Sequence, residues 1–231
     1  MWQDHHILIT GGGRRVGCEL VNFFWKLGAQ ITSSYLTTVP DDGTSRERHL
    51  PIQADLTRPE EAKKMVECAV ARFGPLSCLI HSASSFIPNE AGDEFFDWDR
   101  VSDIHLRAGF VLAQEFSKHA RSGGTLVFIV DTYAERGLEH FSAYCAAKSG
   151  LLGMIRFFAK QWAPRLRVNG VSPGPVLFPD GYSQEQRARI LAHVPLGQGS
   201  ASDVAYAVAF VITNKYITGQ CIRIDGGLNL Y

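Results

Sequence analysis

Short apolar segments and longer amphipathic segments alternate along nearly the whole chain. The apolar segments are mostly continuous and lack the every-second-residue alternation of a strand with one solvated face. Continuous apolar runs are typical of strands that are covered on both faces of a parallel sheet. Strands are therefore predicted at residues 6–10, 30–35, 50–55, 76–84, 124–131, 167–171 and 221–225.

The segments between these runs show the spacing of amphipathic helices. The clearest one follows Thr57, with Pro59 in its first turn and apolar residues recurring on one face from Ala62 to Phe73. Thr57 and Glu60 have the spacing of a capping box at its start. Other helices are predicted at residues 16–27, 98–119, 142–162, 183–193 and 202–213. The alternation of strands and helices predicts a single domain, residues 1–231, built on a doubly wound parallel α/β sheet of about seven strands.

Composition and charge narrow the classes of protein to consider. Hydrophobic residues make up 45% of the 231 residues and charged residues 20%, as in an ordinary globular protein. Lys plus Arg and Asp plus Glu both number 23, so we expect neither a nucleic-acid nor a membrane partner. The five cysteines lack metal-ligand or CxxC spacing, and the first ten residues are too polar for a signal peptide. We therefore expect a reduced, cytoplasmic protein without a metal site.

A glycine-rich turn, TGGGRRVG, joins the first predicted strand to the first predicted helix. Glycines allow the backbone to approach a pyrophosphate closely, and a helix N-terminus adds free N–H groups and the positive end of its dipole. Thr10, Gly11 and Gly17 fit the pattern TGxxxGxG, whereas Arg15 stands where the middle glycine would be. This context predicts a dinucleotide site.

The residues after the second strand indicate which dinucleotide binds. An NAD site usually has Asp or Glu there to hold the ribose 2′-hydroxyl, but the segment SSYLTT, residues 33–38, contains no acid. Arg14 and Arg15 lie in the phosphate loop, where guanidinium groups could pair with a 2′-phosphate. We infer NADPH, although either arginine alone could simply face solvent.

Three residues near the fifth strand carry candidate chemistry. Tyr144 and Lys148 are four residues apart on a predicted helix and so share one face. A nearby ammonium favours a phenolate, so we expect Lys148 to lower the pKa of Tyr144. Asp131 ends the fifth predicted strand, where burial could raise its pKa and let it deliver a proton. The alternative is that Asp131 only caps a following turn. Tyr133 is a poorer candidate than Tyr144 because no lysine lies four residues after it.

The segments TGGGRRVG, HSAS, YCAAK and RVNGVSPG together resemble the short-chain dehydrogenase/reductase family over nearly the whole chain. Asp131 stands where that family usually has serine, and Arg15 stands where it usually has glycine. These departures, with SASSF at residues 82–86, resemble the pteridine reductase branch, and bacterial dihydromonapterin reductases most of all. The resemblance implies a Rossmann-like fold and a homotetramer.

The resemblance also implies which residues hold the cofactor. Lys148 would hold the nicotinamide ribose, Val176 would lie near the carboxamide, and Asp55 would contact the adenine. Asp55 could instead serve only the turn before Thr57. The full predicted NADPH set is Gly11, Arg14, Arg15, Val16, Gly17, Ser34, Tyr35, Asp55, Leu56, Ser82, Ala83, Tyr144, Lys148, Pro173, Gly174 and Val176.

The implied activity is NADPH-dependent reduction of a C=N bond in a dihydropterin, 7,8-dihydromonapterin or a close relative. Phe86 would stack on the pterin ring, unless it merely fills the core. Ser84 would hydrogen-bond the pterin or the cofactor phosphate, while Asp131 and Tyr144 would manage protons. Two alternatives stay open: a ketone or quinone reductase that tolerates Asp131, and a non-catalytic NADP-binding protein.

Two histidines and one polar segment complete the predictions. His105 stands where the resembled family has asparagine, and it could order a water, join a proton relay or be an ordinary buried histidine. His81 is predicted to be structural. Residues 176–196 are predicted to form a mobile substrate lid, because the helix expected at 183–193 has little apolar face.

Overall fold

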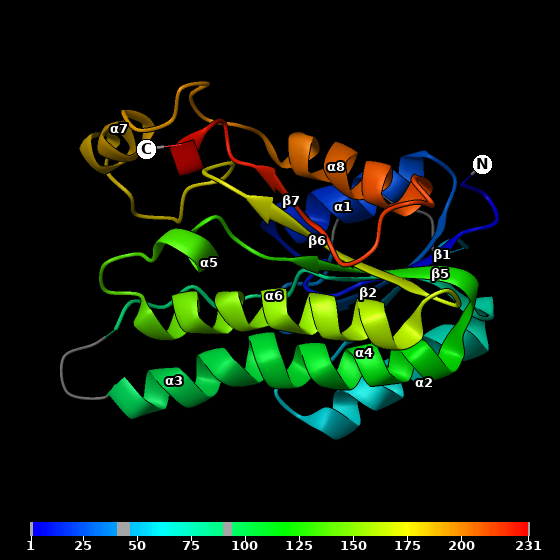
Figure 1. Cartoon of the computed structure of the whole chain (residues 1–231). Helices are drawn as coiled ribbons and strands as arrows, with labels where there is room; N and C mark the ends of the chain where they lie inside the picture. Colours follow the sequence, from blue (N-terminus) through cyan, green and yellow to red (C-terminus); the bar gives the residue numbers. More distant parts are fainter. Residues whose placement is uncertain (1, 41–46, 90–93, 231) are drawn as a thin grey trace.

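The computed structural model describes residues 2–40, 47–89 and 94–230, and its centre is one parallel sheet (Figure 1). The strands are β1 (His6–Ile9), β2 (Gln30–Tyr35), β3 (His49–Gln53), β4 (Leu76–His81), β5 (Ala120–Ile129), β6 (Arg167–Pro173) and β7 (Cys221–Ile224). They lie in the order β3-β2-β1-β4-β5-β6-β7, with every neighbouring pair parallel. The predicted seven-stranded doubly wound sheet is therefore confirmed.

Helices cover both faces of this sheet. They are α1 (Arg15–Lys26), α2 (Pro59–Phe73), α3 (Glu94–Ser102), the π-helical segment η1 (Asp103–Arg107), α4 (Ala108–His119), α5 (Tyr133–Arg136), α6 (Ser142–Trp162), α7 (Gln184–Leu191), α8 (Ala201–Thr213) and the short 3₁₀ segment η2 (Leu228–Leu230). Helices α1 and α8 lie on one face, and α2, α4 and α6 lie on the other (Figure 1).

The continuous apolar character of the strands follows from this double cover. In β1, Ile7 and Ile9 belong to the core under α1 and α8, whereas Leu8 belongs to the core under α2, α4 and α6. Successive side chains of a strand point to opposite faces, so a strand with two buried faces needs an apolar residue at every position. All three side chains are fully buried.

Two local predictions are wrong. The helix expected at residues 98–119 begins at Glu94 and is interrupted by η1, where the Ala108 N–H bonds to the Asp103 carbonyl five residues earlier. Such π-turns are rare and are frequently found at functional sites. The structure describes the start of α2, and the expected capping box is not formed there. Thr57 instead donates its hydroxyl hydrogen to Asp55, whose own N–H bonds to the Glu61 carboxylate.

The ends of the strands place the candidate residues. Strand β5 ends at Ile129, so Asp131 lies just beyond the sheet rather than within it. The carboxyl ends of β1, β2, β3, β4, β5 and β6 lie along one edge, which is where ligands bind in open α/β sheets. Within the described residues, no helix has the length and apolar character needed to cross a membrane.

Candidate active site

A cavity of about 850 Å³ opens at the carboxyl edge of the sheet. Its lining includes every residue that the sequence assigned to cofactor, catalysis or substrate. These are Gly11, Arg14, Arg15, Val16, Gly17, Ser34, Tyr35, Asp55, Leu56, Ser82, Ala83, Ser84, Phe86, Asp131, Tyr144, Lys148, Pro173, Gly174 and Val176. The fold thus brings the predicted set into one cavity, while the ligand that each residue would contact stays a prediction.

The glycine-rich turn packs too closely for side chains. A Cβ at Gly17 would lie 2.1 Å from the Gly11 carbonyl oxygen, and one at Gly13 would lie 2.2 Å from the Thr38 carbonyl oxygen. Gly11 has φ +70°, a left-handed conformation that glycine adopts without penalty. Because the turn presents bare backbone at the cavity wall beside the first turn of α1, its shape fits a pyrophosphate.

Thr10 ties the turn to the end of β4. Its hydroxyl oxygen accepts the N–H groups of Ser82 and Ala83, both at 3.0 Å. Its own hydrogen therefore goes to His81 Nδ1, also at 3.0 Å. Burial, with the charge of Lys148, lowers the pKa of His81 to about 4, so this histidine is neutral and holds two strand ends together. This contact supports the structural role predicted for His81.

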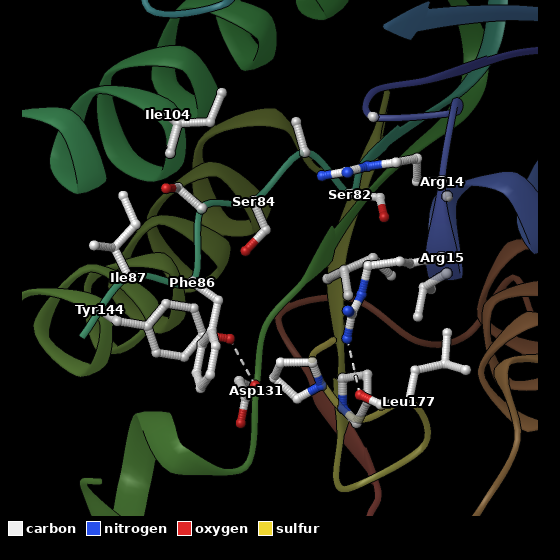
Figure 2. Close-up of a pocket in the computed structure, with 18 of the residues that line it drawn as sticks. Arg14, Arg15, Ser82, Ser84, Phe86, Ile87, Ile104, Asp131, Tyr144 and Leu177 are labelled. Carbon is white, nitrogen blue, oxygen red and sulfur yellow. Dashed lines mark hydrogen bonds between the residues drawn. The ribbon is translucent and has the colours of Figure 1, made fainter. Parts of the chain in front are cut away.

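The two arginines of the turn have different surroundings. Arg15 has φ +55°, so it occupies the left-handed position where a glycine would be unstrained. Its guanidinium donates to the Leu177 carbonyl at 2.9 Å, across the mouth of the cavity (Figure 2). Arg14 lines the cavity separately. Arg15 therefore links the phosphate loop to the predicted lid, and the 2′-phosphate role of both residues stays a prediction.

Asp131 is held by two hydrogen bonds. The Tyr144 hydroxyl donates to one carboxylate oxygen at 2.6 Å (Figure 2), and the Tyr133 N–H donates to the other at 2.9 Å. Burial raises the pKa of Asp131 above its usual value, although these two hydrogen bonds and the Lys148 charge oppose the rise. Asp131 therefore caps the turn that begins α5 and also presents a buried carboxyl with a raised pKa to the cavity.

The expected effect of Lys148 on Tyr144 is wrong in this structure. Burial first, and then the neighbouring Asp131 charge, raise the pKa of Tyr144 well above 10. The ammonium of Lys148 donates to the Ile129 carbonyl at 2.8 Å and lies 5.6 Å from the centre of the Tyr144 ring. Burial lowers the pKa of Lys148 to about 8. Tyr144 stays protonated near neutral pH, and Asp131 is the hydrogen-bond partner of its hydroxyl.

Phe86 packs against a second aromatic ring, a contact that the sequence analysis did not predict. Its ring stacks on Phe141 with centroids 4.2 Å apart and an interplanar angle of 17°, and it meets the Tyr144 ring edge-on. Phe86 is 36% exposed and lines the cavity, so part of its ring surface is accessible to a ligand. The sequence signal was weak: Phe141 is one aromatic residue just before the helix that carries Tyr144.

Ser84 lines the cavity beside Tyr144 and also contacts His105. The Ser84 hydroxyl oxygen lies 2.9 Å from His105 Nε2, and His105 Nδ1 lies 2.8 Å from the Val101 carbonyl oxygen. The His105 ring is fully buried and meets the Tyr144 ring edge-on at 5.6 Å. Both ring nitrogens of this buried histidine thus have partners, and one of these partners, Ser84, lines the cavity, while the water-ordering and proton-relay roles of His105 stay predictions.

A family model described as enoyl-(acyl carrier protein) reductase matches residues 16–229, nearly the whole chain. The chain belongs to the short-chain dehydrogenase/reductase family. It is similar to the dihydromonapterin reductase of Klebsiella pneumoniae, with 29% identity over 97% of both chains. Members of this family are oxidoreductases with NAD(P)-type cofactors, so this chain is an oxidoreductase of that kind.

Solved structures are also similar to this chain over nearly its whole length. A short-chain dehydrogenase/reductase (glucose/ribitol dehydrogenase) from Brucella melitensis has a TM-score of 0.92 at 26% identity, covering 98% of this chain and 97% of that one. FolM alternative dihydrofolate reductase 1 from Brucella canis, solved in complex with NADP, has a TM-score of 0.90 at 28% identity, covering 100% and 96%.

The helix of the predicted lid has little packing against the rest of this short-chain dehydrogenase/reductase fold. Helix α7 contains no buried residue, and the structure describes its whole length. A capping box between Ser183 and Gln186 begins the helix. From this segment Phe178, Tyr182 and Ile190 reach the cavity lining, none of which the sequence analysis singled out. Its closure over a ligand stays a prediction.

Proposed function

We propose that this short-chain dehydrogenase/reductase uses NADPH to reduce a dihydropterin, 7,8-dihydromonapterin or a close relative, to the tetrahydropterin. The observation that carries the proposal is the hydrogen-bonded pair of Asp131 and Tyr144. Reduction of a ketone places hydride on carbon and a proton on oxygen, and reduction of a pterin C=N bond places hydride on carbon and a proton on the ring nitrogen. A buried carboxyl with a raised pKa, hydrogen-bonded to the tyrosine, is suited to hold the proton for that nitrogen.

The cavity suits NADPH. Bare backbone of the glycine-rich turn would face the pyrophosphate, and Lys148 would face the nicotinamide ribose. Ser34 and Tyr35, at the end of β2, leave no carboxylate to repel a 2′-phosphate, and Arg14 supplies a positive charge nearby. When bound, NADPH supplies the hydride. The NADP complex of the Brucella canis neighbour supports this assignment.

The chain's own residues handle the proton. Asp131 holds it until the substrate is bound, and the Tyr144 hydroxyl, 2.6 Å away, can pass it to ring nitrogen N5 by giving up its own hydrogen and taking that of Asp131. The Asp131 anion that remains accepts hydrogen bonds from Tyr144 and from the Tyr133 N–H. Such hydrogen bonds stabilise the carboxylate as it forms. Asp131 is therefore proposed as the proton donor and Tyr144 as the group that conveys the proton.

The substrate wall fits a flat heterocycle. Phe86 lines the cavity with part of its ring exposed, and stacking on Phe141 fixes the orientation of that ring. Ser84 lies on the same side of the cavity as Phe86 and Tyr144 (Figure 2). We propose that residues 176–196 then close over the ligand. The similarity to dihydromonapterin reductase supports a pterin substrate.

A substrate panel tests the proposal. NADPH oxidation would be followed with dihydromonapterin, dihydrobiopterin and dihydrofolate, and in parallel with ketones and quinones. We expect the highest kcat/KM with one of the dihydropterins. The proposal fails if only carbonyl compounds are reduced, which would favour a ketone or quinone reductase. It also fails if NADPH binds and no substrate in either panel is turned over.

A further inference from the structure

The position of one hydrogen on His105 follows from its contacts. The ring lies in η1, fully buried, with Nδ1 2.8 Å from the Val101 carbonyl oxygen. A carbonyl oxygen can only accept a hydrogen bond, so Nδ1 must carry the hydrogen. Burial and the nearby Lys148 charge hold the pKa of His105 well below 6.5, which leaves the ring neutral. Nε2 is then without hydrogen and can only accept.

The orientation of the Ser84 hydroxyl follows in turn. Its oxygen lies 2.9 Å from His105 Nε2, and because that nitrogen has no hydrogen, the hydrogen between them belongs to Ser84. A serine hydroxyl has one hydrogen and two lone pairs. Ser84 therefore faces the cavity with lone pairs only, and it can accept a hydrogen bond from a ligand but cannot donate one.

The neighbouring Tyr144 hydroxyl donates to Asp131 at 2.6 Å in this structure, and it also lies next to Ser84. Ser84 and Tyr144 lie together in the cavity lining (Figure 2). Ser84 is thus arranged for a ligand that brings its own hydrogen, whereas Tyr144 is the group proposed to convey a proton to the substrate. A dihydropterin carries ring N–H groups and an amino group, whereas a ketone or quinone presents carbonyl oxygens that would meet the Ser84 lone pairs.

We propose that His105 is a positioning residue that fixes Ser84 as a hydrogen-bond acceptor, and that Ser84 thereby selects N–H-bearing substrates over carbonyl substrates. This inference rests on the proposed function, because it names the feature of the dihydropterin that the site recognises. Ser84 would accept a hydrogen bond from the substrate, whereas a serine in a carbonyl-reducing site donates one to the substrate carbonyl.

A double-mutant cycle tests the connection between the two residues. His105→Leu removes the acceptor and frees the Ser84 hydrogen to point into the cavity, and Ser84→Ala removes the oxygen. The readout is the ratio of kcat/KM for dihydromonapterin to kcat/KM for phenanthrenequinone. In the Ser84 background, His105→Leu should lower this ratio about tenfold, as expected for one hydrogen bond that is lost and one acceptor contact that is replaced. In the Ser84→Ala background it should leave the ratio unchanged.

The result that overturns the proposal is an equal change in both backgrounds, or no change in either. An equal change would mean that His105 acts by supporting the fold and not through Ser84. NADPH affinity and the melting temperature of each variant are measured alongside, so that a general loss of structure is recognised.

A second measurement requires no substrate. Heteronuclear NMR on the wild-type protein, labelled with heavy nitrogen in its histidines and sequence-specifically assigned, reports the tautomer of His105 at neutral pH. The Nδ1–H tautomer is expected, and an Nε2–H tautomer or a doubly protonated ring would overturn the proposal. If the wild-type protein reduces no dihydropterin, the proposed function fails while the tautomer result still stands, so the two failures can be told apart.

Discussion

Two walls of the same cavity are built in opposite ways. The catalytic wall consists of Ser84, His105, Asp131, Tyr144 and Lys148, and each of these side chains has a hydrogen-bond partner inside the protein. The lid wall, residues 177–196, contains α7, a fully described helix without a buried residue. The contacts that hold the lid wall include its own capping box and the Arg15 hydrogen bond to the Leu177 carbonyl.

The two walls are therefore suited to different tasks. One holds the groups proposed for proton transfer, and the other is suited to admit and cover a ligand. Groups that transfer a proton must be held within a fraction of an ångström, and a wall with satisfied buried partners provides this without ordering on binding. A segment that admits and covers a ligand must open at low free-energy cost, which requires few buried contacts. Changes in the catalytic wall should therefore affect turnover and whole-protein stability, and changes in the lid wall should affect local order and substrate KM.

The largest effect is expected from Asp131→Asn in the catalytic wall. Asparagine keeps the shape and can accept the Tyr144 hydrogen bond, but it has no acidic proton to give. We expect kcat/KM for dihydropterin to fall by about 10²–10⁴. NADPH affinity, measured by fluorescence titration, should be nearly unchanged.

The pH profile sharpens this prediction. Burial raises the pKa of Asp131, so its acid form persists to higher pH than that of an ordinary carboxyl. Wild-type activity should therefore fall as pH rises through that raised pKa, and the Asp131→Asn variant should lack this limb of the profile. A variant that reduces dihydropterin at the wild-type rate would rule out Asp131 as the proton donor.

A second effect concerns stability, and it comes from Lys148. Burial lowers its pKa from 10.5 to about 8 in the folded protein. The unfolded chain then binds more protons between these two pH values, so the folded protein gains stability as pH rises through this window. Below pH 8 the buried ammonium costs about 3 kcal/mol, the free-energy equivalent of the shift.

Lys148→Met removes this titration while keeping a long apolar side chain. The stability difference between the variant and the wild-type protein, variant minus wild type, should shrink by about 3 kcal/mol as pH rises from neutral to 10.5. Denaturant unfolding of the two proteins at a series of pH values measures this difference. Parallel stability curves for the two proteins would mean that Lys148 is not desolvated as the structure indicates.

What could be predicted from the sequence depended on motif spacing. The predicted site residues from TGGGRRVG, HSAS and YCAAK all line one cavity, because strand ends of a parallel sheet meet at one edge and the motifs follow those ends. The role of the His105 ring could not be predicted, because it depends on the π-turn at Asp103–Arg107.

The direction in which the pKa of Tyr144 shifts could not be predicted from the sequence either. Helix spacing shows that Lys148 is near Tyr144, but not that Asp131, thirteen residues earlier, lies 2.6 Å from its hydroxyl. Phe141 was missed for a similar reason, since only the stacked geometry distinguishes it from an ordinary loop aromatic residue. Contacts between segments that are distant in sequence decide such electrostatic and packing details.

The smallest effects are expected at two capping boxes of the same kind, one at the start of α7 and one at the start of α8. Because the two boxes are alike, they allow a matched comparison between the lid wall and the core. Ser183 and Gln186 begin α7 in the lid wall, whereas Ser200 and Asp203 begin α8, which buries six residues in the core. Replacing either serine by alanine removes a hydrogen bond worth about 1 kcal/mol to its helix. Ser200→Ala should lower the melting temperature by about 2–4 °C, because α8 unfolds with the whole domain.

Ser183→Ala should leave the melting temperature nearly unchanged, because α7 has no buried residue through which to affect the core. It should instead speed hydrogen exchange at the Gln186 amide, whose acceptor is the Ser183 hydroxyl, and raise the KM for dihydropterin by up to about fivefold at constant kcat. This follows because a less ordered α7 must be ordered when the ligand is covered. Equal melting shifts in the two variants would show that α7 belongs to the cooperative core, and the separation of the two walls would then be wrong.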